Sequence, residues 1–224
     1  LTQEPKSPPP TDEQRQSVMT LLREIYGDEY AAATSAEAKS ALAETVLDTA
    51  KDTADGVSRY AMIKLATDIA VQAADLAVVN EAIDVMDRLY EIDATAVRVE
   101  ALIGAVKRVD TTTEPAALLA VLDFCNQAID RDDYDAANQL VAASLTSFAD
   151  ADSREELDRL ADRIRSQEFE FENVREPLQV LAEQPDDAEA NLAVGRYRCF
   201  VRDDWTTGLK HLAKGSDERL KKVA

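Results

Sequence analysis

Turn-forming residues are scarce in this chain, which has only 6 glycines and 7 prolines among 224 residues. A sheet protein needs a turn about every eight to twelve residues, and turns consume glycine, proline and asparagine. Apolar side chains recur here at spacings of three and four, which is the period of one face of an α-helix. Hydrophobic residues make up 46% of the chain, too many for a disordered protein. The sequence therefore predicts an all-α fold.

The pattern predicts roughly 10–11 helices joined by short turns. Thr11 with Gln14, and Thr34 with Glu37, are capping-box pairs that mark the starts of the first two helices. Gly56 suits the left-handed position that ends a helix, so we expect it to close the second one. Pro177 kinks a helix or lies in its first turn, and we expect two helices in 153–183, broken around 168–170.

The chain opens with a polar stretch rich in proline, and we predict a disordered linker over residues 1–10. It starts at Leu1, not at methionine, and it stops inside a helix-like stretch, so we expect a piece of a longer, exported protein. The run 111–115 (Thr-Thr-Thr-Glu-Pro) is a clear break. It separates predicted N-terminal hairpins at 11–110 from C-terminal hairpins at 111–224, the two halves forming one continuous solenoid.

The net charge is −19, and it is unevenly distributed. Residues 196–224 carry eight basic and four acidic side chains, a balance of +4 within an acidic protein. An acidic surface repels phosphate groups, so we expect neither nucleic-acid binding nor docking on an anionic membrane. No apolar run approaches the ~18 residues that a membrane span needs, so we expect no membrane insertion.

Residues that carry chemistry are few. His211 is the only histidine, and neither a zinc-binding HExxH motif nor a phosphate-binding or dinucleotide-binding glycine motif occurs. His211 is interpreted as a packed helix residue. The acidic run 130–135 lacks the glycine and the distal glutamate of a calcium loop. We predict no catalytic site, no metal and no cofactor, so the chain is expected not to be an enzyme. Whether Cys125 and Cys199 are paired stays open.

Two segments are candidates for binding a partner. Arg196, Arg198 and Arg202 form a basic cluster, and the last two, four residues apart, share one helix face. They either pair with the acidic helices of the preceding hairpin or bind an anion or an acidic peptide in the groove of the last repeat. The segment 168–172 alternates glutamate with phenylalanine. It is either a helix junction with Phe171 in the core or an exposed aromatic ledge for a partner.

A repeated turn pattern predicts stacked αα-hairpins. Asp132-Asp133-Tyr134-x-x-Ala137 matches Asp203-Asp204-Trp205-x-x-Gly208, an aromatic at the turn followed by a small residue that lets two helices approach. A single hairpin cannot bury both apolar faces, so such units stack. This pattern resembles the tetratricopeptide repeat (TPR) family, whose Leu-Gly step is represented by Val194-Gly195 and whose inter-repeat linker resembles 184–190.

The TPR resemblance is strongest over 185–215 and weaker over 115–149, and Asn191 and Gly208 depart from the family pattern. It implies an irregular TPR-like solenoid that binds a protein or peptide. The C-terminal sequence, from Pro185 through Trp205 to Ala213, is also similar to a helical region of exported planctomycete proteins. This similarity implies a secreted accessory module.

We therefore expect a non-enzymatic protein–protein interaction or scaffolding module, exported to the periplasm or cell surface. The alternative is an accessory domain of an envelope or polysaccharide-acting enzyme whose catalytic domain lies outside this chain. A small-ligand binder is disfavoured by the 5% aromatic content.

Overall fold

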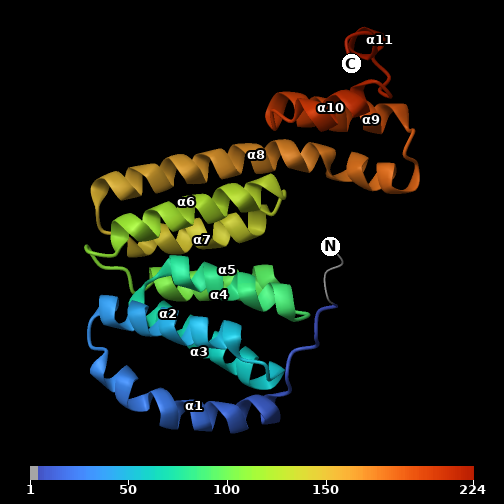
Figure 1. The fold of residues 1–224 in the computed structure, drawn as a ribbon. Coiled ribbons are helices and arrows are strands. Elements are labelled where there is room, and N and C mark those ends of the chain that lie inside the picture. Colours follow the sequence, from blue (N-terminus) through green and yellow to red (C-terminus); the bar gives the residue numbers. More distant parts are fainter. Residues whose placement is uncertain (1–4) are drawn as a thin grey trace. The chain divides into compact units, whose positions relative to one another are not determined.

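A computed structural model describes residues 5–224, and Figure 1 shows that their regular structure is helical. Within those residues there are eleven α-helices and one π-helix, and no strand, so the predicted all-α class is confirmed. The elements are α1 (Asp12–Ala32), α2 (Ala36–Asp52), α3 (Gly56–Ala73), α4 (Leu76–Leu89), α5 (Ala94–Val106), α6 (Glu114–Asp130), α7 (Tyr134–Ser147), α8 (Ala151–Glu183), α9 (Ala188–Arg196), η1 (Tyr197–Val201), α10 (Trp205–Leu212) and α11 (Glu218–Lys221).

The chain divides into two compact units, one that ends at Leu160 and one over Ala161–Ala224, and the division falls inside α8. The predicted boundary between residues 110 and 111 lies within the first unit, in the loop that joins α5 to α6. Of the predicted linker, residues 1–4 lie outside the described residues. Ser7, in its second half, donates its N–H to the Leu89 carbonyl at 2.9 Å and accepts from the Glu91 N–H at 2.8 Å.

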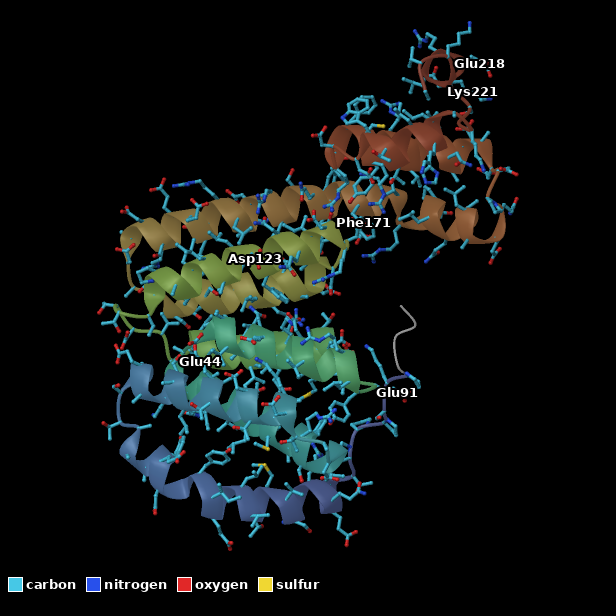
Figure 2. The ribbon with its side chains drawn as sticks, in the orientation of Figure 1. Glu44, Glu91, Asp123, Phe171, Glu218 and Lys221 are labelled. Carbon is cyan, nitrogen blue, oxygen red and sulfur yellow. The ribbon has the colours of Figure 1, made fainter. Side chains whose placement is uncertain are left out.

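The first unit is built from helices that pack in sequence order. α2 packs against α3, α4 against α5, and α6 against α7, while α1 packs on α3. Contacts of α3 with α4 and α5, and of α5 with α7, join these pairs, and Figure 2 shows the side chains between the helices. The buried residues are mainly alanines and branched aliphatics, such as Ala43, Val46, Ile63 and Ile83, each with no exposed surface. Small side chains of this kind allow close helix packing.

Three connections share one turn geometry. Ala74, Asp132 and Asp203 have left-handed backbones, with φ of 55°, 58° and 53°, and each precedes an aspartate that caps the next helix. In the first two turns the N–H of that aspartate bonds the carbonyl five residues earlier, Asp75 to Ala70 at 3.0 Å and Asp133 to Ala128 at 2.9 Å. This is the Schellman arrangement. The two turns noticed in the sequence therefore share the left-handed residue and the capping aspartate, whereas the Asp204 N–H reaches back six residues, to Arg198.

A buried glutamate ties α6 to the connection between α7 and α8. The Glu114 side chain is 3% exposed, and its carboxylate accepts hydrogen bonds from the N–H groups of Ala149 and Asp150 at 3.2 and 2.9 Å. Pro115 lies in the first turn of α6. The threonines before it do not cap α6 with their side chains; the Asp110 carboxylate instead accepts from the N–H groups of Thr112 and Thr113.

Several predicted helix ends differ in the structure. Ser35 caps α2 in place of Thr34. Gly56 begins α3 instead of ending α2, because the Asp55 carboxylate accepts from the Ser58 N–H and starts the next helix there. The expected break at 168–170 is wrong: α8 runs unbroken over 33 residues with Pro177 inside it. Glutamate, glutamine and arginine dominate 165–176, and all three favour helix.

Candidate functional site

The second unit contains a hairpin made of α9, η1 and α10, whose helices approach closely at two glycines. A Cβ on Gly195 would lie 2.7 Å from Leu212 Cδ2, and a Cβ on Gly208 would lie 2.3 Å from Cys199 Sγ. Asp187 caps α9 by accepting from the Ala190 N–H, and Asp204 caps α10 by accepting from the Thr207 N–H. The hairpin is therefore held by local caps and by direct helix contact.

The first arm of this hairpin ends in a π-helix. The Arg202 N–H bonds the Tyr197 carbonyl at 3.1 Å, and the N–H of Asp204 reaches back six residues to the Arg198 carbonyl at 2.8 Å. The corresponding bonds in the α3–α4 and α6–α7 turns span five residues. This hairpin thus contains one extra residue before its turn. π-Helical turns are rare, and they occur frequently at functional sites.

The three predicted arginines occupy different environments. Arg196 is exposed, and within residues 5–224 its guanidinium makes no hydrogen bond or close ion pair, although its charge adds to the backbone N–H groups of Arg219 and Leu220 in lowering the pKa of Asp217. Arg198 and Arg202 are half-buried and engaged with other groups. The Arg198 guanidinium lies 5.9 Å from the centroid of the Tyr197 ring. Of the predicted cluster, Arg196 is therefore the cation most available to a partner.

Two large aromatic side chains are exposed beside these arginines. Phe200 and Trp205 are 59% and 45% exposed, and their rings meet edge to face with centroids 5.4 Å apart. The Trp205 indole Nε1 donates to Asp203 Oδ1 at 2.6 Å, which fixes the ring at the turn. The repeated turn pattern aligns Trp205 with Tyr134, but Tyr134 is only 3% exposed whereas Trp205 is 45% exposed. The α9–η1–α10 hairpin therefore exposes its turn aromatic to solvent, whereas the α6–α7 hairpin buries the aromatic at the same position.

A groove of about 400 Å³ lies beside Phe200, between α8 and the first arm of the hairpin. Its walls combine apolar side chains with a cation, an anion and an amide. The lining residues are Glu170, Asn173, Val174, Ala193, Arg196, Tyr197, Phe200 and Val201. Tyr197 is buried, and its ring centroid lies 6.0 Å from that of Phe171, so the floor of the groove is packed. Figure 2 labels Phe171 on α8.

His211 takes part in a buried polar network. The Asn191 amide, 1% exposed, donates from Nδ2 to the carbonyls of Pro185 and Asp187 at 3.0 and 2.8 Å. Its Oδ1 lies 2.9 Å from His211 Nδ1, and because the amide oxygen can only accept, the imidazole donates from Nδ1. Burial, helped by the charges of Arg198 and Lys214, lowers the pKa of His211 below its ordinary value. This geometry suits a structural histidine.

The remaining candidates carry less chemistry. Residues 5–224 contain no cluster of three or more histidine, cysteine or acidic side chains placed to hold a metal ion. Cys125 and Cys199 are both buried, and they are not joined by a disulfide. Phe169 is 69% exposed on α8, whereas Phe171 is half-buried, so the 168–172 segment points its two aromatics in different directions. In the acidic run 130–135, Asp133 is used as the cap of α7.

Sequence reasoning found Arg196 but missed its surroundings. The π-helix, the exposed Phe200 and the groove that combines Arg196 with Glu170 were not predicted. Their only sequence signal is the aromatic pair at 200 and 205 on either side of an aspartate turn. No helix in the described part of the chain is both long and apolar enough to cross a membrane. Comparisons with protein-family models, with curated proteins and with solved structures gave no match.

Proposed function

We propose that this chain is a non-enzymatic protein–protein interaction module of an exported bacterial protein, built as an irregular TPR-like solenoid of αα-hairpins. Hairpins that pack in sequence order and share one turn geometry support this architecture. Its partner is a protein segment that docks on the second unit.

One observation carries the proposal: the exposed Phe200–Trp205 pair next to the groove and to Arg196. Aromatic residues and arginine are the side chains most enriched at binding hot spots. Burying a large apolar side chain in a core stabilises a protein by roughly 1–3 kcal/mol, and two aromatic side chains that stay exposed forgo part of that free energy. An interaction partner that covers the pair would recover that free energy.

A selection from a phage-displayed library of random 12-residue peptides tests the proposal. The immobilised chain is compared with the double variant Phe200→Ser/Trp205→Ser and with Leu119→Ser, which removes a side chain that is 69% exposed on α6. We expect peptides that bind the wild type and the Leu119 variant alike and lose at least about tenfold in affinity on the double variant. Circular dichroism checks that each variant is folded.

If the selection enriches no peptide, or if the enriched peptides bind the double variant as well as the wild type, the proposed function is wrong at this surface.

A further inference from the structure

We infer that the segment bound at this groove is acidic and carries one large apolar side chain, an inference that rests on the proposed function. The groove offers an apolar side chain a wall made by Val174, Ala193, Phe200 and Val201. Its volume of about 400 Å³ admits a leucine or phenylalanine side chain with room for neighbouring backbone. The exposed face of the Phe200–Trp205 pair extends that apolar wall toward the turn.

The charge of the partner follows from Arg196. This guanidinium lines the groove and makes no close ion pair or hydrogen bond within the described residues. A guanidinium presents a fixed fork of donors that fits a carboxylate with two parallel hydrogen bonds. A carboxylate that docks there meets a cation whose donors are still available, so few existing interactions need to be broken.

The charges around Arg196 agree with this assignment. Residues 196–224 have a balance of +4 within a chain of −19. The acidic groups at the turn are already engaged, because Asp203 accepts from the Trp205 indole and Asp204 caps α10. An acidic segment is repelled by most of this protein and attracted by this hairpin, which directs its encounter to the site.

Glu170 lines the same groove and has the opposite charge, so a substitution at Glu170 tests whether the bound segment is acidic or basic. If an acidic segment binds through Arg196, Glu170 repels it, and removing the Glu170 charge strengthens binding. If a basic segment binds instead, Glu170 attracts it, and the same change weakens binding. Glu170→Gln keeps the shape of the side chain and removes its charge, and Arg196→Gln replaces the guanidinium with a shorter, neutral polar side chain.

The experiment measures fluorescence anisotropy of the peptides that the selection enriches and that depend on Phe200 and Trp205. Each is synthesised with blocked termini, so that its carboxylates come only from side chains. We expect a net negative charge and one leucine, isoleucine, methionine or aromatic residue in each. We expect Arg196→Gln to weaken binding about tenfold and Glu170→Gln to tighten it by about twofold or more.

Matched controls separate this effect from net charge. Lys222→Gln removes an exposed positive charge from the same region and should leave affinity within about twofold. Replacing the peptide's acidic residues by their amides should abolish the difference between wild type and Arg196→Gln. Peptides that depend on the aromatic pair but are neutral or basic, or a loss of affinity in Glu170→Gln, would overturn this inference while the proposed function stands.

Discussion

The Asn191–His211 contact shows how one polar residue organises a hairpin. Asn191 stands where the TPR pattern has an aromatic, and its buried amide joins the 185–187 linker to α10 through hydrogen bonds alone. Each group in this network has a partner, so burial of the amide is compensated. The network requires a proton on Nδ1, and burial of the imidazole, which lowers the pKa of His211, favours the neutral form of the ring. The stability of the second unit should therefore depend on the protonation of His211.

The pKa of His211 is lowered in the folded protein, so the unfolded chain takes up the proton first as the pH falls. Its contribution to stability is complete above the ordinary histidine pKa of about 6.5 and is lost as the pH falls below it. We expect the free energy of unfolding of the second unit to fall between pH 7 and pH 5, by less than the one-proton limit of about 1.4 kcal/mol per pH unit.

Urea unfolding of the wild type and of His211→Gln at pH 7, 6 and 5 measures this effect. The advantage of the wild type should shrink as the pH falls. Carboxylates in the unit with resolved shifts, Asp204 and Asp217, have pKa values lowered chiefly by backbone N–H donors, so they titrate below this window. Identical pH profiles for both proteins would show that His211 is not the titrating group.

In the α9–η1–α10 hairpin, the contact of α10 with the end of α9 and with η1 sets how closely the helices approach. Gly208 leaves no room for a methyl group, because a Cβ there would also lie 2.9 Å from the Cys199 backbone nitrogen and 3.1 Å from the Gly195 carbonyl oxygen. Two of these three neighbours are backbone atoms, which cannot rotate away. The distance between the two helices is therefore set by the absence of a side chain.

We predict that Gly208→Ala destabilises the second unit by about 1–3 kcal/mol, the usual cost of overpacking a well-packed site. Gly27→Ala is the matched control, since nothing lies within 4 Å of a Cβ at that position in the middle of α1. That change should stabilise α1 by up to about 1 kcal/mol, because alanine favours helix over glycine. Urea unfolding followed by circular dichroism checks both; a neutral Gly208→Ala would contradict the close helix contact.

Most helices could be predicted from the sequence, because apolar period and capping residues act over a few residues. The capping box at Thr11 and Gln14 is present in the structure, and the break at 111–115 is the loop and first turn that precede and open α6. Gly56 was misplaced because glycine is common on both sides of a helix boundary, and only the neighbouring Asp55 decides which helix it joins. The break expected in α8 is absent because the glutamates, glutamine and arginines of 165–176 favour helix and the helix continues through Pro177.

The candidate site was harder to predict than the helices. Arg196 stood out by charge, but whether an arginine is exposed or engaged depends on residues distant in sequence. The π-helix that contains Phe200 packs against α10, a contact that the local sequence does not encode. Glu114 shows the same limit, because its two backbone partners lie 35 and 36 residues away.

For the whole molecule, the main electrostatic feature is that charge is divided unequally between the two units. Residues 1–160 contain 14 basic and 31 acidic side chains, a net charge of −17, whereas residues 161–224 contain 11 and 13, a net charge of −2. Self-repulsion destabilises a compact state with a large net charge. The first unit should therefore be the one whose stability responds to screening by salt.

We predict that raising NaCl from 0.01 to 0.15 M slows hydrogen exchange of the buried α3 and α4 amides about fivefold. The Debye length then falls from about 30 to about 8 Å, which removes most repulsion between distant carboxylates. Amides of α9 and α10 should change by less than about twofold, because their unit is nearly neutral. Ion pairs such as Lys51 with Glu81 oppose this trend, but exposed pairs contribute little.

A charge variant gives the same test without salt. Glu44, Glu91 and Asp123, labelled in Figure 2, are exposed acidic residues of the first unit. The triple variant Glu44→Gln/Glu91→Gln/Asp123→Asn keeps the shape of these side chains and makes that unit less negative by three charges. At 0.01 M NaCl the triple variant should exchange its α3 and α4 amides more slowly than the wild type, and at 0.15 M the difference should shrink. If salt instead speeds exchange in the first unit, its ion pairs outweigh its self-repulsion, and the acidic surface stabilises the fold.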